Sequence, residues 1–223
     1  MYGRKAYFLT LLLVFLLLLT VILVSGDRAL TIPLGSRHPF WLNVFFVNYT
    51  FMGDGIFAVC LSAFVGLYLQ KRTTGIQLFA GFMISAFLVQ LMKNLISPAA
   101  ITLFVEQGQY LFFTDEQVLA NYHSLPSGHT ATAFSITTIL ALNIRSVKAQ
   151  FSLLFAAMLL AFSRMYLAQH QLGEIVVAVI TGSISGILAV EMLKWKIPVL
   201  QGRITWRNAR SRTTVKVPDL QSV

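Results

Sequence analysis

Two histidines and one glutamate carry the clearest chemical signal in the sequence. His170 lies four residues before Glu174 in the stretch SRMYLAQHQLGE, residues 163–174. Residues four apart on a helix share a face. A carboxylate that hydrogen-bonds one imidazole nitrogen leaves the other nitrogen free to attack an electrophile. His129, which ends the stretch PSGH, could then donate a proton to a leaving alkoxide.

Groups that bind anions accompany these histidines. Pro126 and Ser127 are typical of a helix start, where Ser127 can cap the first turn and the Gly128 amide becomes a donor at a positive helix end. Lys93 and Arg164 would add two positive charges, and an arginine forks well onto phosphate oxygens. These groups are the ones that phosphoryl transfer without a metal requires: a cation cluster, a nucleophile, a carboxylate that orients it and an acid.

A zinc site is the alternative raised by the histidines and acidic residues. No HExxH or comparable ligand spacing occurs in the sequence, and its single cysteine excludes both a thiolate cluster and an internal disulfide. We therefore expect neither a metal nor an organic cofactor.

The elements that must position these groups are apolar helices. The 223-residue chain is 57% hydrophobic and only 11% charged, with a mean hydropathy of +0.74, whereas an ordinary soluble domain is about 25% charged. Six apolar runs are candidate membrane spans. The first run is longer than the apolar core of a signal peptide, and the residues after it make a poor cleavage site. The six runs lie at residues 6–24, 55–70, 75–95, 128–144, 151–168 and 174–194.

This pattern predicts an all-α polytopic membrane protein with six transmembrane helices in a bundle and extracytoplasmic active-site loops. The fourth run contains many Thr and Ser residues, so we expect it to face other helices. The sixth contains Gly182 and Gly186 at a spacing that suits close helix packing. Residues 1–200 would form the membrane domain, with an interfacial segment at about 26–53 and a long outer loop at about 97–126. Residues 201–223 would form a basic tail.

Basic residues predict the orientation of the bundle. Most of the 17 Lys and Arg residues fall at the N-terminus, in alternate loops and in the tail, which places both termini in the cytoplasm. This bias accounts for the net charge of +9 without a nucleic acid partner. Lys93, PSGH and residues 163–174 then share the extracytoplasmic face, by parity of the spans. We expect an integral protein of a bacterial inner (plasma) membrane, in contact with membrane lipids.

The motifs PSGH and SR-x5-H-x3-E resemble those of the type-2 phosphatidic acid phosphatase superfamily, the integral-membrane lipid phosphatases related to vanadium haloperoxidases. The family motifs read K-x6-R-P, PSGH and SR-x5-H-x3-D, and the resemblance extends over about residues 53–186. It implies a phosphohistidine mechanism, in which His170 attacks phosphorus, Glu174 orients it and His129 protonates the leaving group.

The resemblance also assigns a substrate and its binding residues. It implies that a lipid phosphate or diphosphate is hydrolysed at the outer leaflet. The residues that would hold the phosphate oxygens are Lys93, Ser127, Gly128 and Arg164.

The sequence departs from the family pattern at three positions. Ala100 and Ile101 stand where the first motif has arginine and proline, and Glu174 stands where the third motif has aspartate. A degenerate relative, weakly active or binding phosphorylated lipid without hydrolysing it, is therefore an alternative. A transporter is another, although transporter sites are expected at mid-membrane. The identity of the lipid, the oligomeric state and the roles of His38 and His123 stay open.

Overall fold

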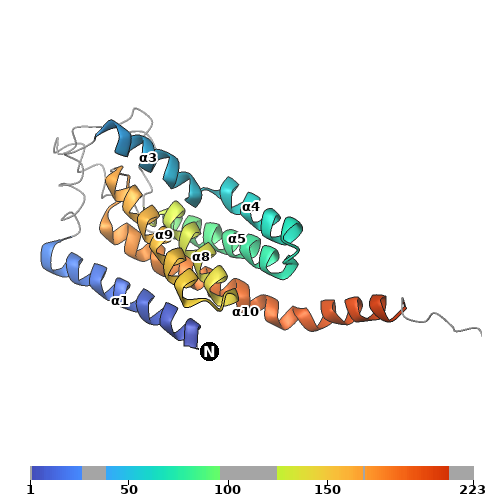
Figure 1. Ribbon diagram of the computed structural model, residues 1–223. Helices are drawn as coiled ribbons and strands as arrows, with labels where there is room; N and C mark the ends of the chain where they lie inside the picture. The colour runs from blue at the N-terminus through green and yellow to red at the C-terminus, as the bar shows by residue number, and fades with distance from the viewer. Residues whose placement is uncertain (1, 27–38, 96–124, 168, 211–223) are drawn as a thin grey trace, which may run out of the picture. The chain divides into compact units, whose positions relative to one another are not determined.

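The computed structural model describes residues 2–26, 39–95, 125–167 and 169–210 (Figure 1). Over these residues it contains helices and no strand, as the sequence predicts. They are α1 (Tyr2–Ser25), α3 (Phe40–Thr50), the 3-10 turn η1 (Phe51–Gly53), α4 (Gly55–Ala63), the π-helical turn η2 (Phe64–Tyr68), α5 (Arg72–Leu95), α8 (Gly128–Asn143), α9 (Val147–Tyr166) and α10 (Leu172–Arg210). The chain forms two compact units, Met1–Val190 and Glu191–Val223, and α10 continues from the first into the second.

Within the described residues, four helical segments are long and apolar enough to cross a membrane: Lys5–Ser25, Arg72–Leu95, Val147–Tyr166 and Leu172–Leu193. A fifth span arises if Phe40–Gly53 and Gly55–Tyr68, which are bent by 58° relative to each other, count as one broken span. The prediction of six spans is therefore not confirmed in number. The run at 55–70 is only the second half of this bent pair, and α8 has 16 residues, fewer than the roughly 20 that a span needs.

Helix α8 is the most buried helix of the first unit. Eleven of its 16 residues are buried, including Thr130, Thr132, Ser135, Thr137 and Thr138. It packs against α5 on one side and α9 on another. The expectation that this polar run faces other helices is confirmed.

Helix α10 packs closely on α8 because two of its glycines lack side chains. A Cβ atom at Gly182 would lie 2.2 Å from the carbonyl oxygen of Ala131, and one at Gly186 would lie 2.8 Å from that of Ser135. Only a residue without a Cβ allows backbones to approach so closely. The small-residue spacing of the sixth apolar run thus fixes the distance between the two helices whose N-terminal ends carry His129 and Glu174.

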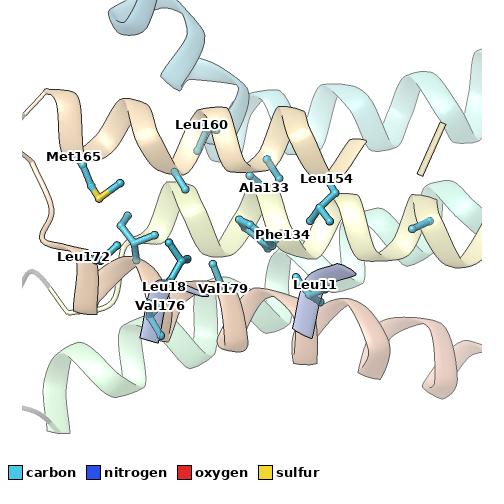
Figure 2. Close-up of a cluster of buried hydrophobic side chains, with 14 of the residues drawn as sticks. Leu11, Leu18, Ala133, Phe134, Leu154, Leu160, Met165, Leu172, Val176 and Val179 are labelled. Atoms are coloured by element: carbon cyan, nitrogen blue, oxygen red, sulfur yellow. The ribbon is translucent and has the colours of Figure 1, made fainter. Parts of the chain in front are cut away.

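A buried apolar cluster holds these helix ends together (Figure 2). Phe134 of α8 and Leu172 of α10 are fully buried in it, and Leu160 of α9 is 2% exposed. Leu11 and Leu18 bring α1 to the same cluster. Because Leu172 follows His170 by two residues, its burial fixes the turn that contains the histidine.

The segment expected to be interfacial is partly helical. Among its described residues, 40–53 form α3 and η1. Phe46 of α3 is buried, with its ring centroid 4.7 Å from that of Tyr166 on α9, and the Tyr49 hydroxyl donates to the carbonyl of Ala156 at 3.0 Å. Helix α3 is therefore packed onto α9 and reaches the end of α9 that carries Arg164.

Candidate active site

The turn between α9 and α10 places His170 against Glu174. The amides of Gln169 and His170 both donate to the carbonyl oxygen of Arg164, at 3.0 and 3.3 Å, which folds the chain back on the end of α9. His170 Nδ1 then lies 2.7 Å from Glu174 Oε2, and both side chains are buried. The predicted contact is present, but its local basis differs from the prediction. His170 precedes α10, so the turn brings the pair together and not a shared helix face.

Glu174 has a second role at the start of α10. It is the third residue of the helix, and the same Oε2 accepts a hydrogen bond from the backbone amide of Gln171 at 3.3 Å. A glutamate at this position commonly reaches back to the residue that caps the helix. Its carboxylate is therefore held from two directions, and this fixes the orientation of the His170 ring.

The surroundings of His170 favour a neutral imidazole. Burial lowers the pKa of His170 below its usual value of about 6.5, because a charged ring loses its hydration. The contact with Glu174 acts in the opposite direction, and the nearby charges of Arg164 and Lys93 lower the pKa further. Because Nδ1 faces Glu174, Nε2 is the nitrogen available for attack.

Arg164 and Lys93 supply the positive charge. Arg164, in the last turn of α9, is only 9% exposed, and its Nη1 donates to Thr50 Oγ1 at 3.1 Å. Its Nε is also buried, without a hydrogen-bond partner among the described residues. Lys93, in the last turn of α5, is close enough to interact electrostatically with Arg164 and Glu174. A buried guanidinium with an unused donor is suited to an oxyanion.

Helix α8 begins as the sequence predicts. The Ser127 side chain accepts a hydrogen bond from the Thr130 amide at 3.4 Å and caps the helix. The amides of Gly128 and His129 belong to the first turn, where helical geometry provides no acceptor. His129 is half-buried, and burial together with the nearby charges of Arg164, His170 and Lys93 lowers the pKa of its ring to about 4. Residues from four separate parts of the sequence thus meet in one polar cluster.

Two residues of this cluster were not predicted. Thr50, at the end of α3, is the hydrogen-bond partner of Arg164. Asp54 lies at the bend between η1 and α4, and its Oδ2 is 4.0 Å from His129 Nε2. Asp54 directly precedes an apolar run, which is a helix-start signal in sequence, but nothing in the sequence relates either residue to the site.

Several predicted positions lie outside the described residues. These are Ala100 and Ile101 of the first motif, and the histidines His38 and His123. Among the side chains that the structure does describe, no three His, Cys, Asp or Glu residues gather as metal ligands would.

The residues that form the cluster match a known family. The family model of the PAP2 superfamily covers residues 74–198, more than half of the chain. The protein belongs to the PAP2 superfamily. The match contains Lys93, PSGH and residues 163–174, so it holds every site residue that the sequence predicts. Thr50 and Asp54 precede it.

Two solved structures share the fold of this PAP2 protein. LpxE from Aquifex aeolicus is 23% identical, with a TM-score of 0.59, and the alignment covers 74% of this chain and 94% of that one. The first transmembrane PAP2 type phosphatidylglycerolphosphate phosphatase from Bacillus subtilis is 21% identical, with a TM-score of 0.59 and coverage of 88% and 98%. A comparison with curated protein sequences gave no significant match.

Proposed function

We propose that this protein removes phosphate from a lipid phosphate or diphosphate at the outer leaflet, through a phosphohistidine intermediate. The observation that carries this proposal is the buried contact of 2.7 Å between His170 Nδ1 and Glu174 Oε2, beside a buried arginine with an unused donor. Binding phosphate needs cations alone, whereas an oriented, neutral imidazole among cations is the arrangement of a nucleophile.

The proposed reaction has two steps. In the first, His170 Nε2 forms a bond to phosphorus, the bond between phosphorus and the lipid oxygen breaks, and His129 gives its proton to that oxygen. In the second, a water molecule attacks phosphorus and loses a proton to His129, and the bond to His170 breaks to release phosphate. Lys93, Arg164 and the first amides of α8 stabilise the charge on the phosphoryl oxygens in both steps.

An apolar cavity beside the cluster supports a lipid substrate. Its volume is about 220 Å³, which suits part of one hydrocarbon chain. It is lined by Tyr49, Met52, Phe57, Leu61, Ala133, Ile136, Thr137, Leu140, Leu153, Ala156, Ala157 and Leu160.

Helices α8 and α9 each carry a residue of the polar cluster about one turn from this cavity lining. On α8, Ala133 follows His129 by four residues, and on α9, Leu160 precedes Arg164 by four. Residues four apart lie on the same helix face. The polar cluster and the apolar cavity are therefore consecutive along the same faces, which is the arrangement that a phosphate headgroup with a hydrocarbon tail requires. The Bacillus subtilis structure is named for a phospholipid phosphate phosphatase, and this name agrees with such a substrate.

The orientation of the protein is part of the proposal. The distribution of basic residues supports cytoplasmic termini and an active site that opens outward. A reporter enzyme that works only in the cytoplasm should be active when it is fused after Val223. Activity of a reporter that works only outside the cytoplasm would contradict this topology.

A second function rests on Ala100, which replaces the arginine of the first family motif. The protein would then bind a phosphorylated lipid and hydrolyse it slowly or not at all. The buried pair of His170 and Glu174 favours hydrolysis, because binding alone does not need an oriented nucleophile.

Phosphate release from a panel of lipid phosphates tests the function directly. The purified protein should hydrolyse phosphatidic acid, phosphatidylglycerol phosphate, lipid A or undecaprenyl diphosphate, and His170→Ala should reduce the rate to background. Tight lipid binding without release above the His170→Ala rate would support the binding protein instead.

The cavity allows a test of the lipid substrate alone. Ala157, which lines the cavity, is buried, and leucine at this position should fill part of the space. Ala157→Leu should lower kcat/KM on a long-chain lipid phosphate more than on a soluble phosphate such as glycerol 3-phosphate. Ala86→Leu is the matched control, because Ala86 lies at an exposed position of α5. Equal losses on both substrates would show that the cavity does not hold the chain.

A further inference from the structure

Asp54 occupies a fixed position at the bend between η1 and α4. It is the N-cap residue of α4, with extended backbone angles, and its Oδ1 accepts a hydrogen bond from the Ile56 amide at 2.7 Å. One carboxylate oxygen is thus held by the start of the helix. The other, Oδ2, lies 4.0 Å from His129 Nε2.

Gly53 holds this bend against the first turn of α8. A Cβ atom at Gly53 would lie 2.7 Å from the carbonyl oxygen of His129 and 2.9 Å from its Cβ. These are distances that a real side chain does not adopt, so the backbone before Asp54 is in direct contact with the backbone of His129. The two side chains are therefore neighbours because their backbones pack together, and not because a long side chain happens to reach across.

Burial and most of the groups near His129 oppose a positive charge on its ring, and the pKa of His129 is lowered to about 4. Lys93 comes from α5, Arg164 from α9, and His170 from the turn before α10, and the charges of all three disfavour the imidazolium form. Glu174, at the start of α10, is in contact with His170 at 2.7 Å. Asp54 is the group from the α4 side, and its carboxylate favours the charged form of His129.

We propose that Asp54 is a positioning residue that favours the protonated form of His129 against the burial and the cations that oppose it, so that His129 can protonate the leaving lipid oxygen. This inference rests on the proposed function. When His129 is protonated, the two groups at 4.0 Å attract each other as an ion pair, yet the distance is too long for a hydrogen bond. A proton on Nε2 is then not held by the carboxylate and is available to the substrate.

The same charge assists both steps of the reaction. In the first step His129 passes its proton to the lipid oxygen as the bond from that oxygen to phosphorus breaks. In the second it takes a proton from the attacking water and becomes charged again. A neighbouring carboxylate makes the imidazole a stronger base, so it raises the share of His129 that begins the first step with a proton and favours the uptake of a proton in the second.

Asp54→Asn tests this role, because asparagine caps a helix as well as aspartate does but carries no charge. We expect kcat/KM on a lipid phosphate to fall about ten-fold, which is less than the roughly 10²–10⁴-fold that a proton-transferring group itself contributes, because Asp54 acts only through His129. The alkaline limb of its pH profile should move to lower pH, because His129 loses its proton more easily. With 4-nitrophenyl phosphate, whose leaving group needs no protonation, kcat/KM should change much less.

Two further variants separate charge from folding. Asp54→Ser also caps a helix without charge and should repeat the Asn result, whereas Asp54→Glu restores the charge and should recover part of the loss. If both uncharged variants keep the wild-type pH profile and lose activity equally on the two substrates, Asp54 is only a helix cap and the inference fails. If the wild-type protein releases no more phosphate than His170→Ala does, the proposed function fails, and this inference fails with it.

Discussion

The region matched by the family model and the region that precedes it contribute different things to the site. Residues 74–198 hold the histidines, the glutamate and both cations. Residues 39–68 contain none of these groups, yet Thr50 contacts Arg164 and Asp54 lies beside His129. The groups that would react with phosphate therefore lie in the matched region, and two side chains that lie against them come from the region that precedes it.

This difference has a chemical cause. A nucleophile, an acid and a phosphate clamp must be particular residue types at particular spacings, so they form motifs. A supporting contact can come from any polar side chain that reaches its target. The bent pair of helices reaches it because Gly53 packs against His129 and Phe46 packs against α9. The four predictions below test how far this division of roles holds.

The largest effect should come from the matched region. Glu174→Gln keeps a residue that can bond the Gln171 amide, but it removes the charge beside His170. We expect activity on a lipid phosphate to fall about a hundred-fold or more, since an uncharged partner can hold the wrong imidazole tautomer. The melting temperature should change little. A loss of activity that only parallels a loss of stability would make Glu174 a helix cap alone.

The next effect concerns the cation that the first motif lacks. Ala100→Arg, combined with Ile101→Pro, should raise kcat/KM on a lipid phosphate about ten-fold or more. A well-placed charged hydrogen bond contributes about 1.5–3 kcal/mol. His170→Ala in the same background should remove the gain. If the double variant stays at the His170→Ala rate, the site lacks more than one arginine, and the binding function gains support.

A smaller effect should come from the region before the match. Thr50→Val keeps the shape of the side chain but removes the hydroxyl that accepts from Arg164 Nη1. Activity should fall about two- to ten-fold, because a hydrogen bond contributes about 0.5–1.5 kcal/mol. Thr20→Val is the control, since Thr20 is exposed and its hydroxyl donates to the carbonyl of Leu16 in its own helix. Equal effects of the two variants would deny Thr50 a role in the site.

The smallest effect is a dependence of stability on pH. The pKa of His170 is lowered on folding, mainly by burial, so the unfolded chain binds its proton more readily. The stabilisation is complete above the unfolded pKa of about 6.5 and is lost as the pH falls from there through the folded pKa. The melting temperature in detergent should therefore fall between pH 7 and pH 5. His170→Ala should reduce this fall in melting temperature. If the melting temperature of the variant falls with pH as steeply as that of the wild type, burial does not have the proposed effect.

The apolar runs predicted most of the helices. The runs at 75–95, 128–144 and 151–168 correspond to α5, α8 and α9, because a long apolar segment in a bilayer must satisfy its own backbone as a helix. The number of membrane spans did not follow from the apolar runs. Whether two short helices form one broken span depends on the bend at Gly53 and Asp54, and neither hydropathy nor length shows such a bend.

The sequence by itself determined which residues would attack, donate and bind phosphate in the proposed reaction, and that Ser127 caps the helix that carries His129. These are properties of residue type and of short spacing along the chain, and they do not depend on how the helices pack. Only the tertiary structure decided that His170 meets Glu174 through a turn, and that Thr50 and Asp54 complete the cluster. Contacts between residues more than 70 positions apart depend on how helices pack, and packing is decided by the whole set of buried side chains at once.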